Sequence, residues 1–496
     1  MIDGMRRFYG PYTEYHVFKR DELKEKDWGE LAIYAAVLSK LCSRQYDLEE
    51  RPEPEEKDIA QSQEIKLKSF VGSYTFNSGN SLVIEYNRKN KINDYDFNSI
   101  TREIAEWGAM FGTPFLKSLL RICSPITGED EISLAYSDLL IRYTENALTE
   151  YIPPVIERRR YTTEVPLGRI HMPRTISLMA QGQTRFVTER AKANIFTLPV
   201  LFQIRFHSEM IKPLKHLQTR LESSDTLKQI QPSRAIFRSV NYHTNFVTER
   251  SRVKLFDLAY DVDFADTNVL NEVREQSSTA PSVLDMVNLW EAFLGRRALL
   301  SLIERILRAG YGLKPLCKLY ELWCLRVILD VLSELFGEYV APRRLPGEFT
   351  FKKRLKGVKA QVLYNRSPRR SMLVKGLKRK GLGVSAGKKP DFTVKFSGSL
   401  GKSITLVLDA KYRVPQNIGN EDLARFFWYL VDYGEFTEEN KLEGLFFHVS
   451  SVPKIHETVW REKPEIIVHL LSMKPSNISR SKPELRKLFS HLMTRL

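Results

Sequence analysis

Two aspartates and a lysine in the C-terminal third have the residue types and spacing of a metal-assisted hydrolytic site. Asp409 and Lys411 end the run SITLVLDAK, which predicts a buried strand whose alternate side chains share one face. Asp391 lies at the start of the preceding predicted strand, KPDFTVKF. A hairpin through the loop SGSLGKS would bring Asp391 next to Asp409. Two adjacent carboxylates repel each other, and a bound divalent cation removes that penalty.

Mg²⁺ fits this ligand set because it prefers oxygen and keeps waters that a phosphate can share. We expect Asp391, Asp409 and the backbone carbonyl of Ala410 to hold it, with Mn²⁺ as a substitute. Lys411 would orient or deprotonate the attacking water and stabilise transition-state charge. The spacing alone is weak, because Glu22–Lys24, Glu55–Lys57 and Glu64–Lys66 share it. A structural ion pair at a strand end is the alternative.

A further acid, Glu321, lies in the apolar predicted helix LYELWCLRVIL. An acid among apolar residues needs a partner, so Glu321 is a third candidate catalytic residue. A surface position on the helix is the alternative. Asp330, from the same helix, is a weaker candidate.

The order of predicted elements divides the chain into four parts. Residues 1–152 read as an α+β region, with a hairpin signal, NSGN, between strands 65–76 and 81–86. Residues 153–310 read as mainly helical. Residues 311–475 alternate helix, strands, helix and strands, which is typical of an α/β fold with helices packed on a sheet. Residues 476–496 predict a basic amphipathic helix.

The formal net charge of +16 favours a polyanionic partner. Between residues 342 and 389, sixteen lysines and arginines face a single acid, so this segment alone contributes +15. It directly precedes the proposed catalytic strands, which favours a surface for a phosphate backbone over a merely solvated one. The DNA-binding candidates in it are Arg369, Arg370, Lys378, Arg379 and Lys380.

Other classes of protein find no support in the sequence. No apolar run is long enough to span a membrane, and the charged N-terminus lacks the apolar core of a signal peptide. The four cysteines form no CxxC pair, which favours reduced thiols in a cytoplasmic protein. No GxxxxGK[ST] sequence occurs, so any nucleotide-driven step needs another polypeptide.

Two stretches carry a resemblance to PD-(D/E)XK nucleases, and more narrowly to the McrC-like nuclease subunit of McrBC-type, modification-dependent restriction systems. LVLDAKYR followed by EDLARFFWYLVDYG resembles the catalytic strand and helix of that family, with Asp422 and Tyr429 at matching positions. The stretch 168–204 resembles the strand, turn and helix that precede its nuclease domain. The chain departs from the pattern at Arg425, where many relatives have glutamine; Arg425 could contact phosphate instead.

The resemblance implies a restriction-endonuclease-like core over 311–475, a mixed sheet flanked by helices. It implies a Mg²⁺-dependent DNA endonuclease that works with an AAA+ GTPase or ATPase in a restriction or defence system. Two alternatives stay open: a non-catalytic nucleic-acid-binding adaptor with a nuclease-like fold, and an autonomous nuclease of repair or of a mobile element. The sequence leaves open DNA against RNA, methylation dependence, and dimerisation for double-strand cleavage.

Overall fold

The computed structural model divides the chain into two compact units that do not follow its linear order. The first, here called the sheet unit, comprises Met1–Ala135, Arg220–Ala235 and Arg297–Leu496, and the second, the helical unit, comprises Tyr136–Thr219 and Ile236–Arg296. The residues described are 5–8, 15–46, 63–68, 70–85, 91–123, 131–150, 155–166, 169–194, 197–222, 231–251, 255–295, 303–304, 306–307, 314–355, 357–366, 389–398, 401–415, 418–433, 441–450, 456–460 and 465–496.

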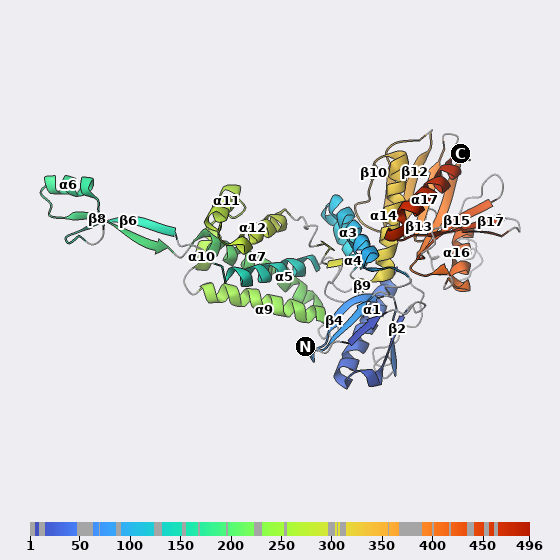
Figure 1. Ribbon diagram of the computed structural model, residues 1–496, viewed down its shortest axis with the longest axis horizontal. Coiled ribbons are helices and arrows are strands. Elements are labelled where there is room, and N and C mark those ends of the chain that lie inside the picture. Colours follow the sequence, from blue (N-terminus) through green and yellow to red (C-terminus); the bar gives the residue numbers. More distant parts are fainter. Residues whose placement is uncertain are drawn as a thin grey trace, which may run out of the picture. The chain divides into compact units, whose positions relative to one another are not determined.

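The C-terminal part of the sheet unit is built on an eight-stranded sheet of order β10-β11-β12-β13-β14-β15-β17-β16 (Figure 1). Its strands are β10 Tyr339–Val340, β11 Gly347–Phe351, β12 Lys359–Tyr364, β13 Phe392–Ser397, β14 Ser403–Lys411, β15 Lys441–His448, β16 His456–Trp460 and β17 Glu465–Ser472. Neighbours from β10 to β14 are antiparallel, β14, β15 and β17 are parallel, and β16 returns antiparallel. The predicted mixed sheet is therefore present.

Helices cover both faces of this sheet. On one face, Phe396 of β13 contacts Phe336 of α14 (Leu316–Phe336) and Phe489 of α17 (Ile478–Met493), with ring centroids 6.2 and 5.8 Å away. Phe396 pairs with Ile404, so Val407, an odd number of residues further along β14, points to the opposite face. Val407 packs there with Phe426 of α16 (Asn420–Tyr433). The core thus has three layers, with β14 between α14 and α16.

The N-terminal part of the sheet unit is α+β, as predicted. Its elements are β1 Met5–Phe8, β2 Tyr15–Lys19, η1 Arg20–Glu22, α1 Glu25–Tyr46, β3 Glu64–Lys68, β4 Phe70–Thr75, β5 Ser81–Glu85, α3 Asp94–Met110 and α4 Gly112–Cys123. The predicted hairpin forms between β4 and β5. Strand β4 also pairs with β9 (Lys314–Pro315), directly before α14. The indole of Trp323 on α14 donates to Glu103 of α3 at 3.0 Å, which joins this part to the C-terminal layers.

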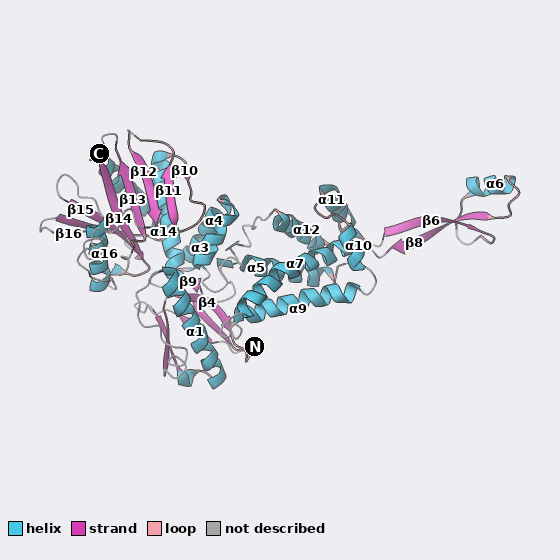
Figure 2. Cartoon of the chain, turned by 180° about the vertical axis from the view of Figure 1, so that it is seen from behind, coloured by secondary structure: helices cyan, strands magenta, loops and turns pink. Residues whose placement is uncertain are grey.

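The helical unit holds its helices around an aromatic core that includes Phe202, Phe206 and Trp290. These helices are α5 Glu131–Ala147, which begins in the sheet unit, α7 Leu198–Glu222, α9 Gln231–Ser251, which also begins there, α10 Leu255–Asp261, α11 Thr267–Gln276 and α12 Pro281–Leu294. A hairpin of β6 (Val155–Thr163) and β8 (Phe186–Asn194) carries α6 (Met172–Ala180) and the short β7 (Arg169–Ile170) at one end (Figure 2). The sequence pattern predicts a helix from about Asn194 to Glu222 with an interruption near Pro213; helix α7 begins at Leu198 and continues through Pro213.

A buried chain of hydrogen bonds links α5, α7 and α9 inside the helical unit. His207 and His243 approach each other through their Nδ1 atoms at 2.7 Å. The Nε2 atom of His207 lies 2.8 Å from the Thr144 hydroxyl, and that of His243 lies 2.8 Å from the Ser137 hydroxyl. All four residues are fully buried.

Candidate metal-dependent hydrolytic site

The β13–β14 hairpin brings Asp391, Asp409 and Lys411 together, as the sequence predicts. Phe392 pairs with Leu408, so Asp391 lies opposite Asp409, and their carboxyl groups are in hydrogen-bond contact. The Lys411 ammonium lies 2.6 Å from the Asp409 carboxylate. The backbone N–H of Ala410 donates to Asp391 Oδ2 at 3.0 Å. The end of β14 thus holds two acids and one base within direct contact.

Burial and charge perturb these groups strongly. Burial and the negative charge of Asp391 raise the pKa of Asp409 to about 7, although Lys411 acts in the opposite direction. Burial alone would lower the pKa of Lys411, but the carboxylates of Asp409 and Asp391 outweigh it and raise that pKa well above 10.5. Lys411 is therefore a permanent cation, and its single positive charge only partly offsets the two neighbouring carboxyl groups.

A second lysine–carboxylate pair reaches the site from α14. Lys318 Nζ lies 2.5 Å from Glu321 Oε2, one helical turn away; Glu321 is buried and Lys318 is mostly buried, with 13% of its side chain exposed. Asn365 Nδ2 donates to the other oxygen, Oε1, at 2.8 Å. Burial and Asp391 raise the pKa of Glu321. Burial lowers the pKa of Lys318, but Glu321 and Asp391 raise it more, to about 12.

Asn365 has a backbone conformation that fits its position in the site. Its φ is +45°, a left-handed value that asparagine tolerates better than most residues. Its backbone N–H donates to the carbonyl of Asp391 at 2.8 Å. Asn365 therefore holds the Asp391 backbone and the Glu321 side chain at once.

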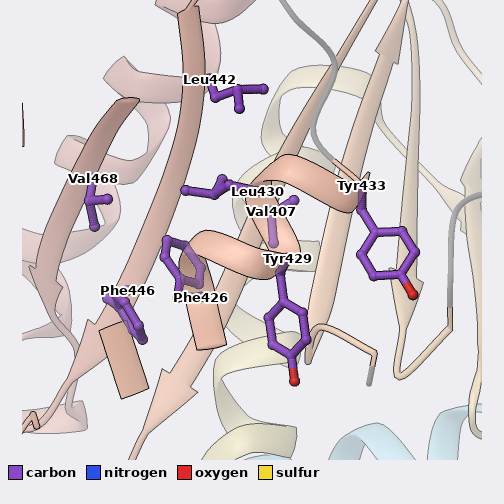
Figure 3. Packing of buried hydrophobic residues seen from close by; sticks show 8 residues of the cluster. All are labelled: Val407, Phe426, Tyr429, Leu430, Tyr433, Leu442, Phe446 and Val468. Atoms are coloured by element: carbon purple, nitrogen blue, oxygen red, sulfur yellow. The ribbon is translucent and has the colours of Figure 1, made fainter. Parts of the chain in front are cut away.

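Helix α16 contributes the positions that matched the resemblance. Asp422 pairs with Arg413, two residues beyond Lys411, and so fixes the start of the helix to the end of β14. Figure 3 shows Tyr429 pointing away from Phe426 and Leu430, which pack toward the strands. Burial and the charges of Asp409 and Asp391 raise the pKa of Tyr429, whereas Arg425 lowers it. The charges of Asp409 and Asp391 thus act on Tyr429, and so does the charge of the half-buried Arg425.

The donor set suits a hard divalent cation. Asp391 and Asp409 supply adjacent carboxylates; burial and, after it, the negative charge of Asp391 raise the pKa of Asp409, and a cation would relieve that charge. Among the described residues, no group of three His, Cys, Asp or Glu side chains is arranged to hold a metal ion. Mg²⁺ does not require three, because it often binds through one or two carboxylates, waters and substrate phosphate. Asp391, Asp409 and the Ala410 carbonyl are the residues that would hold it.

Not every candidate lies in this site. The five basic candidates between 367 and 388, from Arg369 to Lys380, lie outside the described residues. Asp330 pairs with Arg326 and, at 3.5 Å, with Lys482 of α17, so it stabilises helix packing. Sequence reasoning missed Lys318 and Asn365. The one available signal was the three-residue spacing of Lys318 and Glu321 in an apolar helix.

Comparison with known proteins adds two structural similarities. No protein-family model and no curated protein matches this chain. One similar structure is a refined half-complex from a tetradecameric assembly of Thermococcus gammatolerans McrB AAA+ hexamers with bound McrC. It is 12% identical, covers 98% of this chain and 100% of that chain, and has a TM-score of 0.40. Another is the McrBC complex of the same organism, which is 14% identical, covers 66% of this chain and 88% of that chain, and has a TM-score of 0.21. With TM-scores this low, the chemistry of the site stands on the contacts described above.

No helix among the described residues is long and apolar enough to cross a membrane.

Proposed function

We propose that this chain is a Mg²⁺-dependent DNA endonuclease, the cleavage subunit of a restriction or defence system that works with an AAA+ NTPase. The observation that carries the proposal is the contact of Asp391, Asp409 and Lys411 at the end of a buried hairpin. Paired carboxylates beside a fixed ammonium match the chemistry of phosphodiester hydrolysis, and the resemblance of LVLDAKYR to PD-(D/E)XK nucleases agrees with it.

The residues would divide the reaction as follows. A water oxygen bonds to phosphorus and gives up a proton to solvent, the bond from phosphorus to the leaving sugar oxygen breaks, and that oxygen takes up a proton from solvent. Asp391 and Asp409 would hold the cation, which would supply Lewis acidity when bound. Lys411 orients the attacking water and stabilises the negative charge that develops on the phosphoryl oxygens. Arg425 offers a cation to the DNA backbone beside Tyr429.

A protein partner is supported by an apolar surface in the helical unit. Met172, Ile176 and Met179 lie one helical turn apart along α6 and are 57%, 57% and 46% exposed. Exposed apolar side chains on one helix face are typical of a docking surface for another protein. The chain has no nucleotide-binding P-loop sequence of its own, so we assign this face to the AAA+ subunit.

The first experiment is cleavage of methylated and unmethylated plasmid DNA by the full chain with Mg²⁺ or Mn²⁺. We expect Asp391→Ala, Asp409→Ala and Lys411→Ala each to reduce cleavage at least about 100-fold, because each removes a cation ligand or a transition-state contact. Lys212→Ala is the matched control, since Lys212 is exposed on α7 of the helical unit, where it pairs with Glu209 at 3.2 Å. Circular dichroism would show that the variants fold.

Retained cutting by all three site variants would overturn the assignment. If the parent chain does not cut, the assay is repeated with the AAA+ protein encoded beside it. Metal binding without cutting under both conditions would favour the adaptor. Cutting that needs no partner would favour the autonomous nuclease.

A further inference from the structure

The site holds a second lysine, Lys318, that the Asp391–Asp409–Lys411 set does not include. Asp391 lies between two pairs, Lys411 with Asp409 on β14 and Lys318 with Glu321 on α14, and it raises the pKa of both lysines. Burying a lysine is unfavourable unless it is paired. The second pair therefore has a role that the Asp391–Asp409–Lys411 set does not explain.

Glu321 is fully engaged by donors on the protein. Its Oε2 accepts a hydrogen bond from Lys318 Nζ at 2.5 Å, and its Oε1 accepts one from Asn365 Nδ2 at 2.8 Å. Asn365 is itself held by its N–H bond to the Asp391 carbonyl. These contacts hold Glu321 against Lys318 and Asn365. Asp391 and Asp409 are then the two carboxylates available to a metal ion.

The charges of the site lead to the same conclusion. With Asp391, Asp409 and Glu321 all ionised, as a bound cation would favour, these three carboxylates and the ammonium groups of Lys318 and Lys411 leave one net negative charge. One divalent cation and one scissile phosphate would bring the buried site to neutrality. A second divalent cation would leave two positive charges without a counter-ion, which is strongly unfavourable in a buried site.

We propose that the Lys318 ammonium takes the place of a second divalent cation, so that the site binds a single metal ion. This inference rests on the proposed function. Lys318 would be a positioning residue: it holds Glu321 away from the metal and supplies positive charge on the side of Asp391 that faces α14.

The test counts ions bound by the full chain, without DNA, using Mn²⁺ in calorimetry and in electron paramagnetic resonance. Ions that Asp409→Asn also binds are subtracted as surface ions. We expect one site ion for the parent chain and one for Lys318→Arg, which keeps the charge. Lys318→Met frees Glu321 and should bind two, with spin coupling between adjacent Mn²⁺ ions. The double variant Lys318→Met/Glu321→Gln should return to one.

Each outcome decides a separate point. Two coupled ions in the parent chain, or one ion in a folded Lys318→Met, would overturn the inference and leave the proposed nuclease intact. No site ion in the parent chain would overturn the proposed function itself. If Lys318→Met does not fold, the double variant removes both buried charges together, and two site ions there or in the parent chain would refute the inference.

Discussion

The buried histidines of the helical unit share one run of hydrogen bonds, so the proton position on each ring fixes that on the other. The Thr144 hydroxyl donates to the carbonyl of Leu140 at 2.7 Å, so it must accept from His207 Nε2. Neutral His207 then accepts at Nδ1 from His243, and His243 accepts at Nε2 from Ser137. Protonating His207 would set its Nδ1–H against that of His243 across the 2.7 Å contact. Protonating His243 would instead add an N–H that faces Ser137 and would place a positive charge in a fully buried site. The neutral form of each ring is therefore favoured in the folded chain.

This arrangement predicts loss of stability in mild acid. Burial lowers the pKa of His243 from 6.5 to about 4. A histidine whose pKa is lower in the folded state stabilises the fold above pH 6.5, and that stability is lost as pH falls toward 4. The loss is at most about 3 kcal/mol. Thermal unfolding of the full chain at pH 7.5 and 5.0 measures it. The same shift in His243→Gln as in the parent chain would contradict this account.

At the residue scale, the sequence predicts those site members that its local pattern can reveal. Asp409 and Lys411 follow from strand alternation, and Asp391 follows from the start of the adjacent strand. Lys318 and Asn365 could not be found in this way, because a lysine at a helix start and an asparagine at a strand end are ordinary surface features. Their role arises from contacts between α14 and the loop after β12, which only the tertiary fold brings together.

Among the elements, α16 depends on one glycine for its close approach to the sheet. A Cβ on Gly444 of β15 would lie 2.5 Å from Phe426 Cζ and 2.7 Å from Leu430 Cδ2. Phe426 and Leu430 both belong to the buried cluster that packs α16 on the sheet, so neither side chain can move aside. The helix carries Asp422 and Tyr429 to the site, and its seating therefore affects the chemistry.

We expect Gly444→Ala to destabilise the chain by about 1–3 kcal/mol through overpacking. It should also reduce Mg²⁺-dependent cleavage, since α16 must shift. Gly29→Ala in α1 is the control, because a Cβ there meets nothing within 4 Å. Chemical denaturation and the plasmid assay measure the two effects. Equal stability of the two alanine variants would refute the packing argument.

The elements that the sequence predicts are those with a clear apolar period. The helix 314–337 and the strands 403–413 and 464–473 are present as α14, β14 and β17. The sequence does not predict strand β16, HETVW. A short edge strand needs few apolar residues, and β16 is defined by its pairing with β17, which depends on the tertiary fold. The stretch RRRYTTEVPLGRIHM, residues 158–172, predicts one strand by its composition, and this prediction is wrong in its continuity, because β6 ends at Thr163 and β7 spans only Arg169–Ile170.

For the whole molecule, the net charge of +16 predicts salt-sensitive DNA binding. Lysines and arginines that neutralise phosphates release counter-ions, so affinity falls as salt rises. We expect the affinity of Asp409→Asn for a short duplex to fall at least about tenfold between roughly 50 and 200 mM salt. Fluorescence anisotropy with Ca²⁺ in the buffer measures binding without cutting. An affinity that does not change with salt would contradict a phosphate-backbone surface.

The sheet unit takes its chain from three separate segments, which has a consequence for biosynthesis. Residues 136–219 and 236–296, the helical unit, leave the ribosome before the partners of the N-terminal segment exist. The pairing of β4 with β9 and the hydrogen bond between α3 and Trp323 cannot form until these later residues have been synthesised. Asp391 and Asp409 are synthesised later still. A translation product interrupted before Asp391 therefore carries neither carboxylate, and on the proposed function it could not cut the DNA of the cell that makes it.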